Sequence, residues 1–335
     1  MEAMVVQNNQ TISIADYVQR WGNAASIALF DPAYQIFQVP TIDGIIGYRS
    51  IGKCVVVFGD PVCSPDDWGK LVPIFHNHFN RLKKRIVYTT VSERFVTWAL
   101  QHGCSSAIGI GDEFILDPTH DPRARKGYDA SSLRNKYTYS VRQGITVHEY
   151  TGHDVTLETE LEQVACAWLK NRKKRQLHQQ ELNLFDHRSN KRWFYAEHHG
   201  KKVGVLMLNR LNALQGWVMN MLMRIPNCPT TTTEFMVMSA LEILAAEGCN
   251  FFSIGTVPGS TIGKIYRLGR LSTWCAQASF IVGRKFFDKV DRHRYWKKFA
   301  PRSEPTYVLF DRDRVTLHEV WGIMRAYNIS MGPKI

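Results

Sequence analysis

Cationic side chains gather near the end of the chain, in the stretch YWKKFAPRSEPTYVLF (residues 295–310). Lys297, Lys298 and Arg302 flank the first of two prolines, just before an expected strand. Because proline fixes the backbone angle φ, this turn is stiffer than a solvated loop needs to be. A stiff turn that carries cations is typical of a clamp for an anionic group. We therefore predict that Lys298 and Arg302 hold part of an anionic substrate.

Two acidic motifs lie at expected strands and their ends, where functional side chains concentrate. In GIGDEFIL, Asp112 and Glu113 stand within an apolar run. Burial there would raise the pKa of a carboxyl group and suit it to proton transfer, whereas the alternative is a solvated pair. In VFGDPVCSP, Asp60 stands in a tight turn. It either caps the following helix or contributes to a substrate-binding loop.

A basic and aromatic helix is expected over SSLRNKYTYSVRQG (residues 131–144). Arg134 and Lys136 are candidates for phosphate contacts, because a guanidinium fork matches the geometry of a phosphate. The alternative is a solvated helix face with aromatic anchors. The run KNRKKR (residues 170–175) leaves a similar choice between a solvated helix end and contact with nucleic acid.

Arg224 ends a very apolar expected strand, where an unpaired cation would be costly, so we expect it to have an anionic partner. The following Thr231–Glu234 segment fits a capping box, whose helix start can hold an anion or merely cap the helix. In FFSIGTVPGS (residues 251–260), Ser253 and Gly255 belong to a strand end and loop through which a substrate can approach the backbone.

Several common catalytic motifs are missing from the sequence. There is no phosphate-binding Gly-x-x-x-x-Gly-Lys-Ser/Thr loop, no dinucleotide-binding Gly-x-Gly-x-x-Gly motif after the first strand and no Gly-x-Ser-x-Gly nucleophile turn. The histidines lack the paired spacing of zinc ligands, so no metal is expected. The seven cysteines include no Cys-x-x-Cys pair, which favours reduced, buried thiols in a cytoplasmic protein.

Composition and charge limit the possible classes of protein. The chain has 335 residues, of which 44% are hydrophobic and 21% charged, as expected for a globular protein of two domains. Its formal net charge of +12 favours polyanionic partners, either nucleic acid or the anionic inner leaflet of a membrane. No apolar run is long enough to span a membrane, and the N-terminus lacks the pattern of a signal peptide.

The hydrophobic periodicity predicts a mixed α/β protein in which each half has a few antiparallel strands, a helix, a strand, a helix and a strand. The boundary between the halves is placed near Thr151. The expected strands are 34–39, 44–50, 53–59, 85–91, 105–116, 145–150, 192–200, 201–211, 214–225 and 251–255. The expected helices are 13–22, 66–84, 93–103, 131–144, 157–176, 262–272 and one that ends in LAAEGCN.

Together these motifs resemble the C-terminal catalytic domain of the phosphatidylglycerol lysyl- and alanyl-transferases (multiple peptide resistance factors). The similarity extends from about residue 25 to residue 325. The motifs that carry it, in order, are GDPV (59–62), GDE (111–113), LRNK (133–136) in a helix ending at Gly144, MLMR (221–224), FFSIGTVP (251–258) and KKFAPRSEPTY (297–307). The resemblance implies two tandem domains of the GCN5-related N-acetyltransferase type, 1–150 and 151–335, the second carrying most of the catalytic pocket.

Members of this family pass an aminoacyl group from a charged tRNA to a hydroxyl group, commonly of a lipid head group. The resemblance therefore implies an aminoacyltransferase that uses aminoacyl-tRNA as co-substrate and no other cofactor. Because the aminoacyl ester is already activated, catalysis needs alignment and stabilisation of an oxyanion. The protein is expected to be cytoplasmic and to contact the anionic inner face of the membrane peripherally.

The resemblance also implies roles for particular residues. Glu113 or Asp112 would handle the proton or bind the substrate amine. Arg224 and Lys298 would hold a phosphate or the ester oxygen, with Arg302 supporting them. The implied substrate-binding set comprises Asp60, Arg134, Lys136, Ser253, Gly255, Arg302 and Glu304.

The sequence departs from the family pattern at places that affect the substrate. Met221 stands where the family often has an acidic residue, and Ser303 and Thr306 replace a usual aromatic residue and arginine. The acceptor is therefore left open between a lipid or sterol head group and a soluble small metabolite. An acyl-coenzyme A-dependent N-acyltransferase and a non-catalytic module that binds tRNA or membranes are the alternatives from other classes.

Overall fold

The computed structural model describes residues 4–6, 14–171, 184–186, 188–259, 261–269, 272–274, 276–278, 280 and 292–327. The chain divides into two compact units. The first unit comprises Met1–Glu113, Thr256–His293 and Ser303–Ile335, and the second comprises Phe114–Gly255 and Arg294–Arg302.

Both units are discontinuous in sequence. Strand β7 (Ser106–Leu116) leaves the first unit after Glu113, and strand β12 (Phe252–Pro258) re-enters it at Thr256. Residue 151, the expected boundary, lies inside the second unit, which begins at Phe114. The chain returns to the first unit twice, at Thr256 and at Ser303. The division into two repeats of one fold, 1–150 and 151–335, stays a prediction.

The first unit contains a mixed sheet in the order β1-β2-β3-β4-β6-β14-β7. Strands β4 and β6 run parallel, whereas β1–β2, β2–β3, β3–β4 and β6–β14 are antiparallel. Two short strands lie beside the main order, β5 against β3 and β13 against β7. The bounds are β1 (Met4–Val6), β2 (Gln35–Gln38), β3 (Gly44–Ile51), β4 (Cys54–Phe58), β5 (Val62–Cys63), β6 (Arg85–Ser92), β13 (Ile265–Tyr266) and β14 (Arg302–Phe310).

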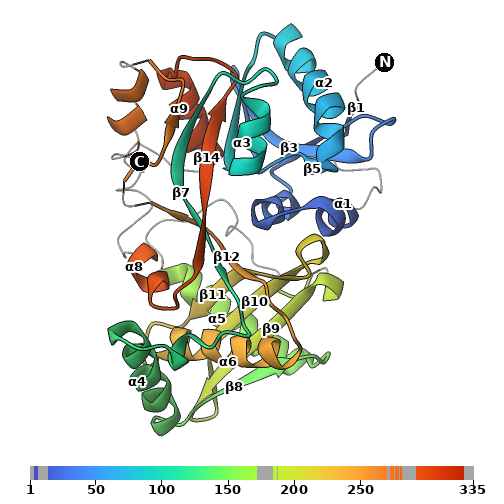
Figure 1. Cartoon of the computed structure of the whole chain (residues 1–335). Coiled ribbons are helices and arrows are strands. Elements are labelled where there is room, and N and C mark those ends of the chain that lie inside the picture. Colours follow the sequence, from blue (N-terminus) through green and yellow to red (C-terminus); the bar gives the residue numbers. More distant parts are fainter. Residues whose placement is uncertain are drawn as a thin grey trace. The chain divides into compact units, whose positions relative to one another are not determined.

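Helices cover both faces of this sheet (Figure 1). Helices α1 (Ile14–Trp21), α2 (Trp68–Arg81), α3 (Glu93–Ala99) and α9 (Leu317–Ala326) belong to this unit. Val55 and Val57 of β4 belong to the same buried cluster as Phe75 of α2. On the opposite face, a Cβ added to Gly322 of α9 would lie 2.9 Å from the Sγ of Cys54. Because successive side chains of a strand alternate between faces, β4 has the unbroken apolar sequence CVVVF.

The second unit contains the sheet order β12-β11-β10-β9-β8. Strands β8 (Ile145–Tyr150), β9 (Lys191–His198), β10 (Lys201–Leu211) and β11 (Gly216–Arg224) are antiparallel neighbours, and β12 pairs with β11 in parallel. Helix α5 (Val155–Asn171) packs on one face, where Leu161 and Val164 join Val205 of β10. Helix α6 (Thr232–Ala246) packs on the other face, where Met236 touches the backbone at Gly204.

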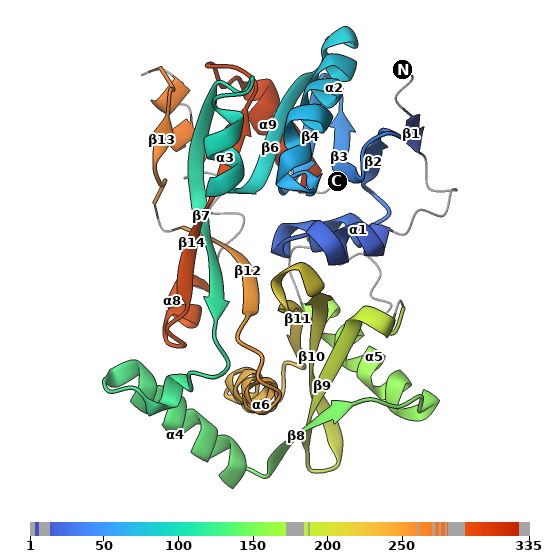
Figure 2. The same ribbon diagram turned by 45° about the vertical axis from the view of Figure 1, so that its right-hand side comes forward.

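Helix α6 is apolar around most of its circumference because it lies between this sheet and α4 (Tyr128–Arg142), as Figure 2 shows. Its buried side chains include Phe235, Met236, Val237 and Met238 at successive positions. A helix that is hydrophobic all round is buried all round. A charged side chain on a buried face of α6, such as Glu234, therefore has to find an ionic partner inside the protein.

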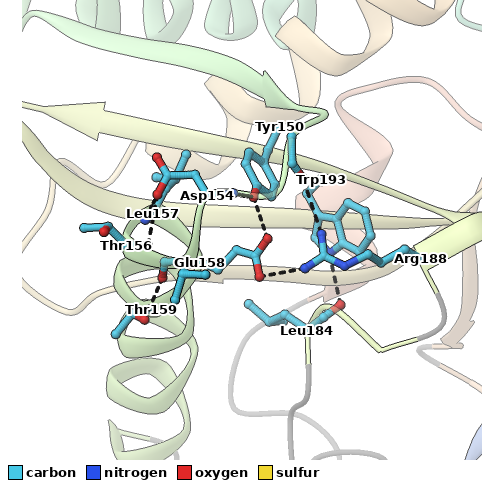
Figure 3. A network of polar contacts seen from close by, with 11 residues as sticks. Tyr150, Asp154, Thr156, Leu157, Glu158, Thr159, Leu184, Arg188 and Trp193 are labelled. Carbon is cyan, nitrogen blue, oxygen red and sulfur yellow. Dashed lines mark hydrogen bonds and ion pairs between the residues drawn. The ribbon is translucent and has the colours of Figure 1, made fainter.

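A polar network fixes the start of α5 against the sheet (Figure 3). The Tyr150 hydroxyl donates a hydrogen bond to Glu158 at 2.5 Å and accepts one from the backbone N–H of Asp154 at 2.7 Å. Arg188 pairs with the same glutamate at 2.6 Å. The indole N–H of Trp193 donates to the carbonyl of Leu184 at 3.1 Å. These contacts tie Leu184 to β9 and Arg188 to α5.

The predicted fold class, α/β with mixed sheets flanked by helices, is confirmed. The helix predicted over 262–272 is wrong in its described part, because Ile265 and Tyr266 instead form β13 and pair with Ile108 and Ala107 of β7. The strand predicted to end at Gly255 continues to Pro258. In the basic run at 170–175, α5 ends at Asn171, and the later residues lie outside the described part of the chain.

Gly111 marks a close approach of two strands inside the first unit. A Cβ there would lie 2.3 Å from the carbonyl oxygen of Val257 and 2.9 Å from the Cα of Pro258. Because both are backbone atoms, no rotamer change relieves the clash, and we expect Gly111→Ala to lower the free energy of unfolding by about 1–3 kcal/mol. Urea unfolding measures this loss. Gly69→Ala is the matched control, since a Cβ on this α2 residue meets no atom within 4 Å.

Candidate active site

Three elements of the second unit meet at the carboxylate of Glu234. Lys136 comes from α4, Glu234 from the first turn of α6, and Lys298 directly follows α8 (Arg292–Lys297). Both ammonium groups donate to the same oxygen, Oε1 of Glu234, and the Lys298 bond measures 2.5 Å. Glu234 and Lys298 are only 3% and 9% exposed. The structure thus brings together Lys136 and Lys298, both predicted from the sequence, around a carboxylate that was predicted only as a cap.

The predicted capping box at Thr231–Glu234 is wrong. Thr231 is the N-cap of α6, but its side chain makes no capping bond and instead accepts a hydrogen bond from Ser140 at 2.8 Å. Glu234 binds the two lysines because a hydrogen bond between two opposite charges is stronger inside the protein than one from a neutral backbone N–H. The signal available in the sequence was an acid in the first turn of a helix that is otherwise mostly apolar.

Burial and ion pairing act in opposite directions on this cluster. Burial lowers the pKa of Lys298 to about 8, although its bond to Glu234 favours the charged form. For Glu234, burial by itself would raise the pKa, but the hydrogen bonds from Lys136 and Lys298 outweigh it and hold the pKa below its usual value. Near neutral pH the carboxylate is therefore charged, and Lys298 is poised close to its own titration.

Two hydroxyl groups extend the cluster. Tyr295 donates to the hydroxyl of Thr233 at 3.0 Å, and Thr233 donates to Oε2 of Glu234 at 2.9 Å. The Lys298 ammonium lies 3.8 Å from the centre of the Tyr295 ring, within the range of a cation–π contact. Burial, assisted by the charge of Glu234, raises the pKa of Tyr295, so this phenol stays protonated. Both oxygens of Glu234 are thus engaged, and Lys298 is held in one position.

Arg224 ends β11 with a half-buried side chain. Its guanidinium lies 3.4 Å from the carbonyl of Ile225 and 3.7 Å from the Sγ of Cys228. It makes no ion pair with a carboxylate in the part of the chain that the structure describes, so the predicted anionic partner is absent. The half-exposed position explains why a cation is tolerated there, because water still solvates part of it. Its charge acts on Tyr295, so Arg224 lies near the Glu234 cluster.

The turn between Lys298 and β14 has a constrained backbone conformation. Phe299 is buried, and Ala300 takes a left-handed backbone angle (φ 55°) that non-glycine residues adopt only at a cost. Pro301 follows, and Arg302 begins β14 with an exposed side chain. This backbone fixes where α8 ends and therefore where the buried Lys298 lies relative to Glu234.

The remaining predicted residues lie apart from the cluster or outside the second unit. Arg134 donates to the carbonyls of Arg123 and Arg125. The buried hydroxyl of Ser253 accepts a hydrogen bond from the N–H of Gly255 at 3.0 Å. Asp112, Glu113 and Glu304 belong to the first unit, the first two on β7 and Glu304 on β14. Their predicted roles stay predictions.

One prediction was that Asp60 caps the following helix, α2. The structure shows instead that Asp60 stabilises the start of α3. Its carboxylate accepts hydrogen bonds from the backbone N–H of Ser92 at 2.9 Å and from the Ser92 hydroxyl at 2.6 Å. Ser92 is in turn the N-cap of α3. Asn23 donates a third, longer bond at 3.4 Å. Burial raises the pKa of the Asp60 carboxyl, and the Ser92 bonds oppose that rise.

We expect Asp60→Ala to lower the free energy of unfolding by about 1–3 kcal/mol, because it leaves the Ser92 donors without an acceptor. Asp60→Asn should cost less, since an amide oxygen can still accept from the Ser92 N–H. Urea unfolding of both variants measures the difference. A variant Asp60→Ala with unchanged stability would show that the carboxylate is not a brace and would favour the predicted substrate-binding role.

Among the described residues, no three histidine, cysteine or acidic side chains gather as a metal site would require. In the same part of the chain, no helix has the length and apolar character needed to cross a membrane.

The sequence model of the family described as phosphatidylglycerol lysyltransferase, C-terminal, matches residues 16–310. The chain belongs to this family. It is 20% identical over 313 residues to a phosphatidylglycerol lysyltransferase of Staphylococcus haemolyticus, a match that covers 91% of this chain and 36% of that protein. The chain thus spans about a third of the length of this lysyltransferase.

Two solved structures have the same fold as this lysyltransferase-family chain. The structure of L-PGS from Bacillus licheniformis has a TM-score of 0.81 at 16% identity, with 97% of this chain and 98% of that chain covered. The C-terminal domain of a putative lysylphosphatidylglycerol synthetase from Agrobacterium fabrum has a TM-score of 0.75 at 18% identity, covering 96% and 98%. The resemblance inferred from the order of the motifs is thereby confirmed.

Proposed function

We propose that this protein is an aminoacyltransferase that moves an amino acid from a charged tRNA to a hydroxyl group of a lipid head group. The family match over residues 16–310 carries the proposal, because the related Staphylococcus haemolyticus protein is a phosphatidylglycerol lysyltransferase. The net charge of +12 suits both a tRNA and an anionic lipid. Peripheral contact with an anionic membrane is part of the same proposal.

The reaction is a transesterification. The acceptor oxygen forms a bond to the aminoacyl carbonyl carbon, its proton leaves to a base, and the ester bond to the tRNA ribose breaks as the ribose oxygen takes up a proton. The carbonyl oxygen carries negative charge in between. A donor that stabilises this oxygen typically contributes about 3–4 kcal/mol to lowering the barrier. No separate source of energy is needed, because the aminoacyl ester is already activated.

Within the second unit, the proposed roles fall to Lys298 and Arg224. Lys298 is held by Glu234 and the Tyr295 ring, and its charged form would bind the ester oxygen or a lipid phosphate. Arg224 would share the anion, since no described carboxylate neutralises it. Glu234 would act as a positioning residue that keeps Lys298 in place and favours its charged state. The base stays assigned, as a prediction, to Glu113 or Asp112.

Incubation of the purified protein with a pool of radiolabelled aminoacyl-tRNAs, with and without total lipid extract, tests the proposal. Label that passes from one tRNA species into the organic phase would support it and identify the amino acid. Label in a soluble product would move the acceptor to a small metabolite. If no charged tRNA is consumed in either condition, the proposal fails, and acyl-coenzyme A donors become the next substrates to test.

A further inference from the structure

One face of helix α4 lines a pocket of about 440 Å³ in the second unit. The helix lies beside α6, as Figures 1 and 2 both show. Apart from Thr231, the lining residues all come from α4 and recur at helical spacing: Tyr128, Ser131, Ser132, Asn135, Lys136 and Tyr139. Steps of three and four residues place side chains on one face of a helix. This face therefore borders the pocket along almost the whole helix.

The other face of α4 is packed against α6, which fixes the pocket wall. Ala130, Leu133 and Ser140 are buried. The ring of Tyr137 meets Phe235 of α6 edge to face, with centroids 4.9 Å apart, and its hydroxyl donates to Glu242 at 3.3 Å. The pocket face is thus presented on a rigid element rather than on a loop.

The side chains on the pocket face have few internal partners. Tyr128 and Tyr139 are 85% and 50% exposed, which is unusual for large rings, and neither stacks on another ring in the described part of the chain. Likewise, the side chains of Ser131, Ser132 and Asn135 make no hydrogen bond to any described residue. Lys136 uses one of its three donors on Glu234. Two rings and several polar groups therefore remain available for a ligand.

The lining identifies the chemical class of that ligand. The pocket contains no leucine, isoleucine, valine, methionine or phenylalanine, so it offers little to an acyl chain. Tyrosine rings stack on nucleobases, hydroxyl and amide groups bind ribose and base edges, and a lysine binds phosphate. The two rings are eleven residues apart, about 16 Å along a helix, which suits more than one nucleotide.

We propose that this pocket binds the unpaired nucleotides at the 3′ end of the tRNA that donates the amino acid. The proposal rests on the function proposed above and names the donor subsite. Lys136 connects the pocket with the Glu234 cluster. It lines the pocket and donates a hydrogen bond to Glu234, which also binds Lys298. A nucleotide bound along α4 thereby comes next to the ionic cluster at which the ester would be handled.

Fluorescence of an RNA with the acceptor-stem sequence, carrying 2-aminopurine in place of the terminal adenine, tests the subsite. Stacking on tyrosine quenches this base, so the full-length protein should quench the probe. Tyr128→Leu and Tyr139→Leu should each weaken binding about tenfold. Tyr128→Phe keeps the ring and should bind like wild type. Val155→Ala, which changes another exposed apolar side chain of the same unit, is the matched control.

The same variants in the transfer assay should show KM for aminoacyl-tRNA raised about tenfold and kcat little changed. Equal affinity and equal quenching in wild type and in both leucine variants would overturn the subsite. So would loss of binding to phosphatidylglycerol–phosphatidylcholine vesicles in these variants without any response of the RNA probe, since the face would then contact membrane.

The two proposals fail in different ways. A wild-type protein that transfers the amino acid but does not quench the probe overturns the subsite and leaves the proposed function in place. A wild-type protein that binds and quenches the probe but consumes no charged tRNA overturns the proposed function and supports the nucleotide site.

Discussion

The Glu234→Gln variant is expected to lose about 3 kcal/mol of its free energy of unfolding at pH 7 and most of its transfer activity. Removing one partner of a buried ion pair typically costs about 3–5 kcal/mol, because the other charge stays buried without compensation. We expect the lower end, since burial already lowers the pKa of Lys298 to about 8 and the lysine can release its proton. Urea unfolding at pH 7 measures the loss.

The loss should shrink as the pH rises. In the wild type, the attraction between Glu234 and Lys298 is present while the lysine is charged and fades as the pH passes about 8. In the unfolded chain the lysine remains charged up to about pH 10.4. In the folded variant the lysine is already neutral, so at pH 9.5 wild type and variant no longer differ in this attraction. The difference in free energy of unfolding between them should therefore be smaller at pH 9.5 than at pH 7.

Glu242→Gln is the matched control for this substitution. It lies on the same helix, and its carboxylate is 41% exposed and paired with Arg123. Arg123 keeps its second ion pair, with Asp121, when Glu242 is replaced, and a pair with an exposed carboxylate contributes about 0–1 kcal/mol, so the control should be nearly neutral. Equal losses of free energy of unfolding in the two variants would show that the buried ion pairs of Glu234 do not stabilise the protein more than the pair of Glu242 does.

Lys298→Met is expected to lower the transfer rate by about 10²–10³-fold, the typical effect of removing one donor from an oxyanion. The loss of stability should be smaller than in Glu234→Gln, because Glu234 keeps the bonds from Lys136 and Thr233. Lys297→Met is the matched control, since Lys297 is adjacent in sequence and exposed. Normal turnover by Lys298→Met would contradict the proposed role.

The pH dependence of the wild-type rate distinguishes the charged from the neutral form of Lys298. If the cation binds the substrate anion, the rate should fall as the pH rises through about 8, where the ammonium loses its proton. Lys298→Arg, which keeps its charge, should remove that fall. A rate that instead increases up to about pH 8 would make Lys298 a proton acceptor. Spontaneous deacylation of the tRNA has to be subtracted at each pH.

The sequence by itself determined many of the elements and the family. The apolar run of β4 and the helical spacing of α2 appear at the predicted residues, because the period of hydrophobic side chains reflects which faces are buried. The position of the turn before β14 could also be predicted from the sequence, since a proline beside aromatic residues restricts the backbone locally. Lys298 was found through this turn.

Only the tertiary structure decided what Lys298 binds. Glu234 is 98 residues from Lys136 and 64 residues from Lys298 in sequence, whereas spacing along a helix relates only neighbours three or four residues apart. The sequence Thr231–Glu234 fits a capping box whether Glu234 caps the helix or binds the two lysines. The packing of α4 and α8 against the start of α6 made two ammonium groups available and so settled the choice. In the same way, pairing with β7 made a strand of Ile265–Tyr266 within a segment whose local pattern favoured a helix.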